Sequence, residues 1–111
     1  MDFKQYERDC LLAAKALIDK HYHTHITIPD LAKKVGLSST RLKDGLKREF
    51  GINPYTYQLH LRMEIAKKIL VETELSLKDI ARMVGYKSAS SFIAAFKREC
   101  KLTPTKYRKD A

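Results

Sequence analysis

A short run of polar residues in the first half of the chain carries side chains that could hydrogen-bond to the edges of nucleic-acid bases. Arg41 has a planar guanidinium that can donate two hydrogen bonds to O6 and N7 of guanine. Asp44 can accept a hydrogen bond from N4 of cytosine, and the methyl group of Thr40 can contact that of thymine, with Lys43 beside them. The alternative is a solvated helix face on which Asp44 simply pairs with Arg41 or Arg48.

The same segment offers cations for phosphate groups. Residues near the start of a helix that enters a groove lie deepest in it, so Lys47 and Arg48 are assigned mainly to phosphates. With the serines that begin the segment, the first set of candidate contacts is Ser38, Ser39, Thr40, Arg41, Lys43, Asp44, Lys47 and Arg48.

A second candidate segment lies near the C-terminus and has smaller side chains. Its members are Lys87, Ser88, Ala89, Ser90, Ser91, Ala94, Lys97 and Arg98. Small residues allow a close approach but supply few donors, so we expect this segment to read methyl groups, groove shape or bridging water. Its three cations, Lys87, Lys97 and Arg98, would contact the phosphates of a nucleic acid. The main-chain N–H groups after the Ser88 cap could also bind a phosphate.

The two segments belong to a duplicated sequence. Residues 31–36 (Leu-Ala-Lys-Lys-Val-Gly) return at 80–85 (Ile-Ala-Arg-Met-Val-Gly), and a Lys-Arg-Glu triplet follows each copy at 47–49 and 97–99. The triplets are one residue further apart than the hexapeptides, which places a one-residue insertion in the turn after the second glycine. A short helix, a turn with glycine and a second helix form the helix-turn-helix layout, whose second helix can enter a major groove.

Cap signals place the helices of both copies. Hydroxyl N-caps are expected at Thr27, Ser38, Ser76 and Ser88. Gly36 and Gly85 should end the short helices in a left-handed conformation. Asn53-Pro54 and Thr103-Pro104 each restart a helix, because a first-turn proline lacks only an N–H that would have no partner there.

Longer apolar patterns complete an all-α fold of about seven helices. The first helix, about 3–20, is predicted to pack through a stripe of Phe3, Tyr6, Cys10, Ala14, Leu17 and Ile18. We expect subdomain 1 at about 3–53, a connecting helix at about 54–72 and subdomain 2 at about 73–111. The connecting helix has a wide apolar surface that predicts contact with both flanking units, and the last helix, 105–108, should only cover the end of the core.

Arg62 on the connecting helix has two open roles. One is a phosphate contact, and the other is a structural bond that holds this helix against the first unit.

Composition limits the possible functions. The 111 residues include 22 Lys plus Arg against 13 Asp plus Glu, for a formal net charge of +9, which favours a polyanionic partner. No apolar run or leader pattern indicates a membrane span or secretion, so a soluble cytoplasmic protein is expected. The two cysteines are predicted to be free thiols, and His21, His23 and His25 lack companion ligands for a metal. No catalytic arrangement or cofactor motif is present, so an enzyme is not expected.

With both copies placed, the chain resembles the DNA-binding domain of the AraC/XylS family of bacterial transcription regulators. Three stretches carry the resemblance: Arg62 to Leu70, Leu77 to Tyr86, and Phe92 to Arg98 with Thr103 to Arg108. The resemblance implies a sequence-specific regulator, presumed here to act as an activator, that inserts its two recognition helices into successive major grooves of duplex DNA. The chain departs from the family at Ala89, Ser90, Ser91 and Ala94, where larger polar residues are common.

The resemblance also bears on partners. RNA polymerase is a candidate partner of such an activator. Family members commonly carry a further ligand-sensing or dimerising domain, so these residues are expected to be monomeric, and both a single-domain regulator and a piece of a longer one stay open. The alternative function is a basic helical module that binds RNA or protein without reading a DNA sequence. Equal affinity for all duplexes would favour that alternative.

Overall fold

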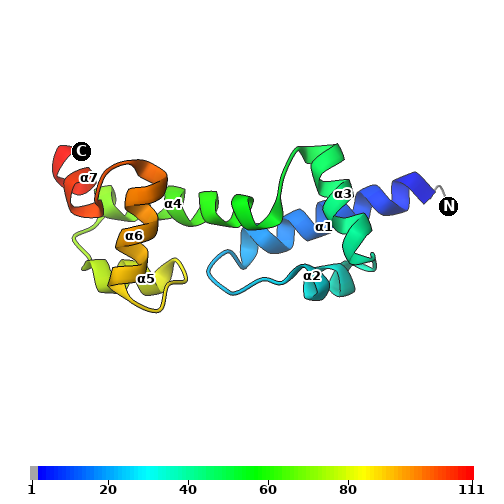
Figure 1. Cartoon of the computed structure of the whole chain (residues 1–111), viewed down its shortest axis with the longest axis horizontal. Helices are drawn as coiled ribbons and strands as arrows, with labels where there is room; N and C mark the ends of the chain where they lie inside the picture. The colour runs from blue at the N-terminus through cyan, green and yellow to red at the C-terminus, as the bar shows by residue number, and fades with distance from the viewer. Residues whose placement is uncertain (1–2) are drawn as a thin grey trace. The chain divides into compact units, whose positions relative to one another are not determined.

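The computed structural model describes residues 3–111, and every regular element in that range is an α-helix. The helices are α1 (Phe3–Lys20), α2 (Ile28–Val35), α3 (Ser39–Phe50), α4 (Pro54–Glu72), α5 (Leu77–Met83), α6 (Ala89–Cys100) and α7 (Pro104–Asp110) (Figure 1). The predicted all-α fold with seven helices is therefore confirmed. The last helix is longer than predicted, since Pro104 begins it and it continues to Asp110.

The chain divides into two compact units after Leu59, a point inside α4. In the first unit, α1, α2 and α3 pack together around side chains that are almost fully buried (Figure 1). These are Leu11, Ala14, Ile18, Leu31, Ala32, Leu42 and Leu46.

The buried face of α1 differs from the predicted stripe. Phe3 is 55% exposed and Tyr6 is 40% exposed, whereas Leu11, which the stripe omitted, is fully buried. The reason is that α3 comes closest to α1 at Gly45: a Cβ atom there would lie 2.8 Å from the Leu11 methyl carbons. The helical stripe that faces the core therefore passes through Leu11, and the aromatic residues of the first turns remain at the edge of the unit.

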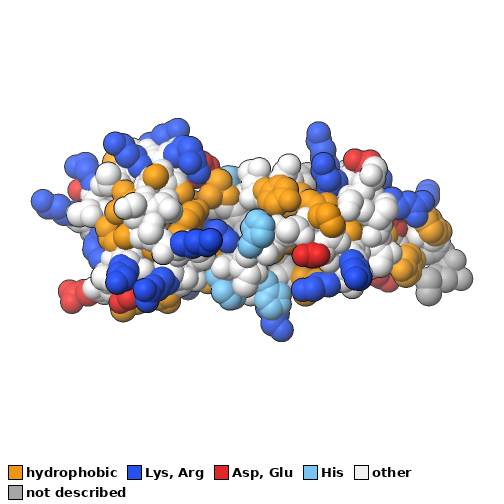
Figure 2. All heavy atoms as spheres, turned by 60° about the horizontal axis from the view of Figure 1, so that its bottom comes forward, with side chains coloured by type: hydrophobic (Ala, Val, Ile, Leu, Met, Phe, Trp, Pro, Cys, Tyr) orange, Lys and Arg blue, Asp and Glu red, His pale blue; other side chains and the backbone are white. Residues whose placement is uncertain are grey.

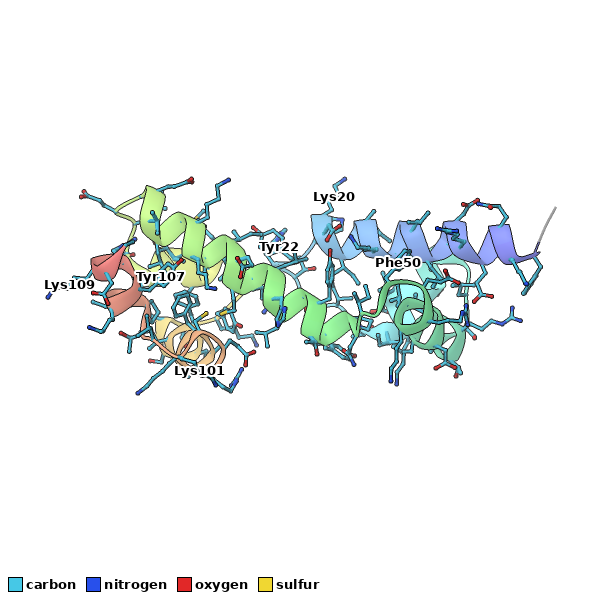
Figure 3. All side chains as sticks on the ribbon, turned by 90° about the horizontal axis from the view of Figure 1, so that it is seen from above. Lys20, Tyr22, Phe50, Lys101, Tyr107 and Lys109 are labelled. Atoms are coloured by element: carbon cyan, nitrogen blue, oxygen red, sulfur yellow. The ribbon has the colours of Figure 1, made fainter. Side chains whose placement is uncertain are left out.

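The second unit combines the rest of α4 with α5, α6 and α7. Its core includes a row of aromatic rings, with centroid separations of 5.9 Å from Tyr86 to Phe92, 5.8 Å from Phe92 to Phe96 and 5.7 Å from Phe96 to Tyr107. Figure 3 shows Tyr107 pointing from α7 into this unit and Lys109 pointing away from it. The last helix thus contributes to the core as well as covering its end.

The predicted caps are confirmed. Each hydroxyl accepts a hydrogen bond from the backbone N–H three residues later, at Thr27, Ser38, Ser76, Ser88 and Thr103. The side-chain oxygen of Asn53 accepts from the N–H of Tyr55 at 3.0 Å and so begins α4. These bonds satisfy backbone donors that have no partner inside a helix.

The two turns differ by the predicted insertion. Gly36 has φ 80° and Gly85 has φ 100°, so both occupy the left-handed region that glycine adopts without steric cost. One residue, Leu37, separates the first glycine from the Ser38 cap. Two residues separate Gly85 from Ser88, and the first of them, Tyr86, lies against Phe92.

Contacts of α4 occur in both units, as its wide apolar surface predicted. In the first unit, Gln58 is buried and donates to the backbone oxygens of Tyr22 at 2.9 Å and Thr24 at 2.6 Å. In the second, Arg108 of α7 donates to the oxygen of Leu70 at 3.0 Å, near the C-terminal end of α4. The hydrogen bonds of Gln58 and Arg108 were not predicted from the sequence.

Three further features concern membranes, thiols and metals. No helix within residues 3–111 is long and apolar enough to cross a membrane. Cys10 and Cys100 are both free, and burial raises the pKa of the Cys100 thiol, so this thiol is protonated at neutral pH. Among the described residues, no three His, Cys, Asp or Glu side chains gather as a metal site would require.

Candidate nucleic-acid interface

The outer face of α3 is fixed by its buried face. Leu42 and Leu46 are fully buried, and because a helix turns by about 100° per residue, Thr40, Asp44 and Lys47 point away from the core. All three are exposed. Their predicted outward orientation is confirmed.

Arg41 and Arg48 lie on one flank of this face. They share a helical stripe with Gly45, which is buried against α1. Both arginines are exposed, but both are in contact with other side chains. On the flank of α3 that faces α1, the exposed cations are therefore already in contact with other side chains.

Side chains of α1 hold the two arginines in different ways. The guanidinium carbon of Arg41 lies 4.6 Å from the centroid of the Phe3 ring. Nη2 of Arg48 donates to Oε1 of Glu7 at 2.9 Å, and its Nε lies 3.5 Å from Glu49. The hydrogen bond with Glu7 raises the pKa of Arg48, whose charge is thus already paired. Among the ion pairs within residues 3–111, neither arginine pairs with Asp44.

The opposite flank of α3 carries unpaired positive charge. Lys43, Asp44 and Lys47 line a hollow of about 360 Å³ together with the segment Gly51–Pro54 that leads into α4. Within residues 3–111, the ion pairs include neither of these lysines. Both lysines are therefore available to an anionic partner.

The outer face of α6 is built from smaller side chains. Phe92 and Phe96 are fully buried, and the exposed members of the predicted set are Lys87, Ser88, Ser90, Ser91, Ala94, Lys97 and Arg98. Ala89, like Ser39 at the corresponding place in α3, is only half-buried. Figure 2 shows Lys and Arg side chains distributed over the second unit, on the left of that view.

Several polar groups of α6 already have partners. The hydroxyl of Ser88 lies 3.0 Å from that of Ser91 and also accepts the N–H of Ser91 at 3.1 Å. Nε of Arg98 donates to Glu99 at 3.0 Å. These bonds leave the second unit with fewer unpaired donors than its sequence suggests.

Arg62 contacts the turn of the second unit. Its Nη1 lies 3.5 Å from the backbone oxygen of Gly85, and its guanidinium lies 5.2 Å from the centroid of the Tyr86 ring. Both contacts lie within the second unit. Tyr6 of α1 makes the equivalent contact in the first unit, with its hydroxyl 3.4 Å from the oxygen of Gly36.

Sequence reasoning missed the part that α1 takes in this surface. The sequence predicts that Phe3 and Tyr6 pack against the core, yet they and Glu7 contact the arginines of α3 and the turn. The four-residue spacing of Phe3 and Glu7 places them on one helix face, but it does not predict which residues they contact.

Comparison with known proteins places this geometry in a family. A family model described as a helix-turn-helix domain matches residues 31–110. The lactose operon transcription activator of Staphylococcus xylosus is 33% identical over 91 residues, which are 82% of this chain and 33% of that protein. The chain spans less than half of the length of the first curated relatives that it matches.

Solved structures agree with this match. The C-terminal domain of AraT, a response regulator from Geobacillus stearothermophilus, superimposes with a TM-score of 0.86 at 31% identity, covering 92% of this chain and 85% of that one. A transcriptional regulator of the AraC type from Chromobacterium violaceum gives a TM-score of 0.79 at 26% identity and covers 92% and 91%. With its two capped helix-turn-helix units, the chain belongs to the AraC/XylS family of helix-turn-helix transcription regulators, whose DNA-binding domain it matches.

Proposed function

We propose that this chain is a sequence-specific DNA-binding module of a transcription regulator, with α3 and α6 as its two recognition helices. The observation that carries the proposal is that each unit buries the apolar face of an N-capped helix and exposes the basic opposite face. A helix of this kind fits a major groove and can meet phosphates on either side.

Within α3, the expected contact of each residue follows from its depth in the groove and from the charge of its side chain. Thr40, Arg41, Lys43 and Asp44 are placed at base edges, and Lys47 with Arg48 at phosphates. The ion pairs of Arg48 reduce its attraction for a phosphate, so Lys47 is the stronger phosphate contact of the two. The contacts of Arg62 with the turn of the second unit orient its guanidinium, whose other N–H donors can meet a phosphate.

In α6, the small residues of the predicted set lie against the floor of the DNA groove. The three cations lie against the DNA phosphates. A monomer with two recognition helices can occupy two half-sites about 34 Å apart, on one face of the DNA. Hydroxyl-radical footprinting of a selected site checks this geometry. Protection of two adjacent major grooves by one chain supports it, and protection of a single groove contradicts it.

Competition binding tests the function itself. A sequence-specific regulator prefers its own site over random duplex by about 10³-fold or more at physiological salt. Selection of bound fragments from genomic DNA supplies that site, and the same fragments with shuffled sequence serve as controls. Equal affinity for all duplexes, or tighter binding to structured RNA, would show that the chain is a basic module without sequence recognition.

The wider role is an extension of this proposal. The Staphylococcus relative is named as an activator, which supports activation over repression and makes RNA polymerase a candidate partner. Such a protein works in the cytoplasm, where the bacterial chromosome lies. The greater length of the relatives is consistent with effector sensing or dimerisation by another part of the protein.

A further inference from the structure

The start of α1 lies against the flank of α3 that carries both arginines. Leu11 packs beneath Gly45, Phe3 lies under the guanidinium of Arg41, and Glu7 accepts a hydrogen bond from Arg48. The absence of a side chain at Gly45 is what allows this close approach, because a Cβ atom there would lie 2.8 Å from Leu11. Two turns of α1 thus reach two cations of the recognition helix.

The two contacts have opposite chemical consequences. An aromatic ring attracts the face of a guanidinium and leaves the N–H groups in its plane free to donate. Arg41 stacked on Phe3 is therefore held in place with its donors available for a bidentate contact with guanine. A carboxylate instead takes up the donors, so the pair of Arg48 with Glu7 withdraws a cation from phosphate contact.

We propose that Phe3 and Glu7 are positioning residues of the DNA interface: Phe3 orients Arg41 toward a base, and Glu7 weakens the contact of Arg48 with the phosphates. This inference rests on the proposed function of the chain. Holding Arg41 in one orientation lowers the entropy lost when it meets a base, which favours the correct site over others. Pairing Arg48 lowers the affinity for all DNA alike, so it weakens binding to random duplex without changing the preference between sequences.

The first variant pair separates the aromatic ring from simple apolar contact. Phe3→Leu keeps an apolar side chain but removes the π face, whereas Phe3→Tyr keeps the ring. Affinity is measured for the selected site and for versions substituted at the base pair that Arg41 contacts. We expect Phe3→Leu to reduce the preference at that base pair by about 2- to 5-fold, and Phe3→Tyr to retain it.

The second variant frees Arg48. Glu7→Gln should tighten binding to random duplex and steepen the dependence of log affinity on log salt by up to about one unit. Asp9→Asn, on the same helix and with the same change in charge, is the matched control and should have a smaller effect because Asp9 pairs with Gln5 rather than with α3. In the double variant Glu7→Gln/Arg48→Ala, the gain should disappear.

The outcomes distinguish this inference from the function on which it rests. If the wild-type chain binds its selected site no better than random DNA, both fail. If the wild type is specific and Phe3→Leu leaves the base preference unchanged, or Glu7→Gln behaves like Asp9→Asn, only the positioning role fails. Thermal unfolding of each variant shows whether a loss comes from the fold instead, and Phe3→Tyr preserves the test if Phe3→Leu is unstable.

Discussion

The two units of this chain use the same plan with different side chains. In each, a long helix precedes a short helix, a turn with a left-handed glycine and a recognition helix. The long helix also contacts the backbone oxygen of the turn glycine in both units, through the Tyr6 hydroxyl on Gly36 and the Arg62 guanidinium on Gly85. A turn carbonyl without an intrahelical partner needs a donor, and either side chain can supply one.

The recognition helices show where the copies diverge. The face of α3 has Arg41 over the Phe3 ring and two lysines without acidic partners, Lys43 and Lys47, whereas the corresponding places in α6 hold Ser91, Ile93 and Lys97. The caps and buried positions stay similar while the outer faces differ. The comparison teaches that one fold can carry an outer helix face with many donors and another with mainly small side chains.

The largest effect is expected in the aromatic row of the second unit. Phe92→Ala should lower the free energy of unfolding by about 3–5 kcal/mol, because it removes the ring between Tyr86 and Phe96 and leaves a cavity. Urea unfolding measures this, with Leu42→Ala as the equivalent change in the first unit. If Phe92→Ala lowers the free energy of unfolding by less than Leu42→Ala does, the contacts within the aromatic row do not stabilise the second unit.

DNA binding should be unequally sensitive at equivalent positions. Arg41→Ala is expected to weaken binding by about 1–3 kcal/mol and to relax the preference at one base pair, while Ser91→Ala should cost clearly less. Lys47→Ala should weaken all sequences alike and lower the salt slope by about one unit. Identical, sequence-independent losses for Arg41→Ala and Lys47→Ala in a titration at several salt concentrations would refute the assigned roles.

A helix-interior glycine marks another difference. Gly45→Ala should destabilise the chain by about 1–3 kcal/mol, although alanine favours helices, because the new methyl group would overlap Leu11. Ala95→Gly, at the equivalent place in α6, should cost about 1 kcal/mol through propensity alone. A double-mutant cycle with Leu11→Ala checks the mechanism: Leu11→Ala should cost less in the Gly45→Ala background, and simple additivity would count against it.

The smallest effects are expected where α3 and α6 end. Gly51 has φ 66° with open space around it, so Gly51→Ala should cost about 1 kcal/mol for the backbone conformation alone. Lys101 occupies the equivalent position with φ 66°, and Lys101→Gly should raise stability by up to about 1 kcal/mol. If both changes prove neutral in thermal unfolding, the left-handed conformation carries no strain at either end.

Much of this fold could be predicted because its signals are local. The caps at Thr27, Ser38, Ser76 and Ser88 each depend on a bond within three residues, and the insertion after Gly85 can be counted in the sequence. The buried pairs of α3 and α6 follow from helical periodicity. The helix content and the outward faces therefore needed no tertiary information.

The contacts between distant residues could not be predicted in this way. The buried stripe of α1 depends on where α3 crosses it, and that crossing depends on the missing side chain of Gly45. The contact of Arg62 with the turn at Gly85 could not be predicted for the same reason, since sequence spacing does not tell which turn a long side chain reaches. The partners of Phe3 and Glu7 likewise appear only when α1 and α3 are packed together.

The central claim is that this chain reads DNA chiefly through α3, and a scan of every base pair in a selected site tests it most directly. Substitutions in the half-site bound by the first unit should typically cost about 1–3 kcal/mol each, and those in the other half clearly less. In the Arg41→Ala variant, the cost of substituting a base pair should fall at one position, and that position should lie in the first half-site. A reversed profile, with the larger costs in the second half-site, would contradict the account and show that the longer turn after Gly85 brings other side chains of α6 into the groove.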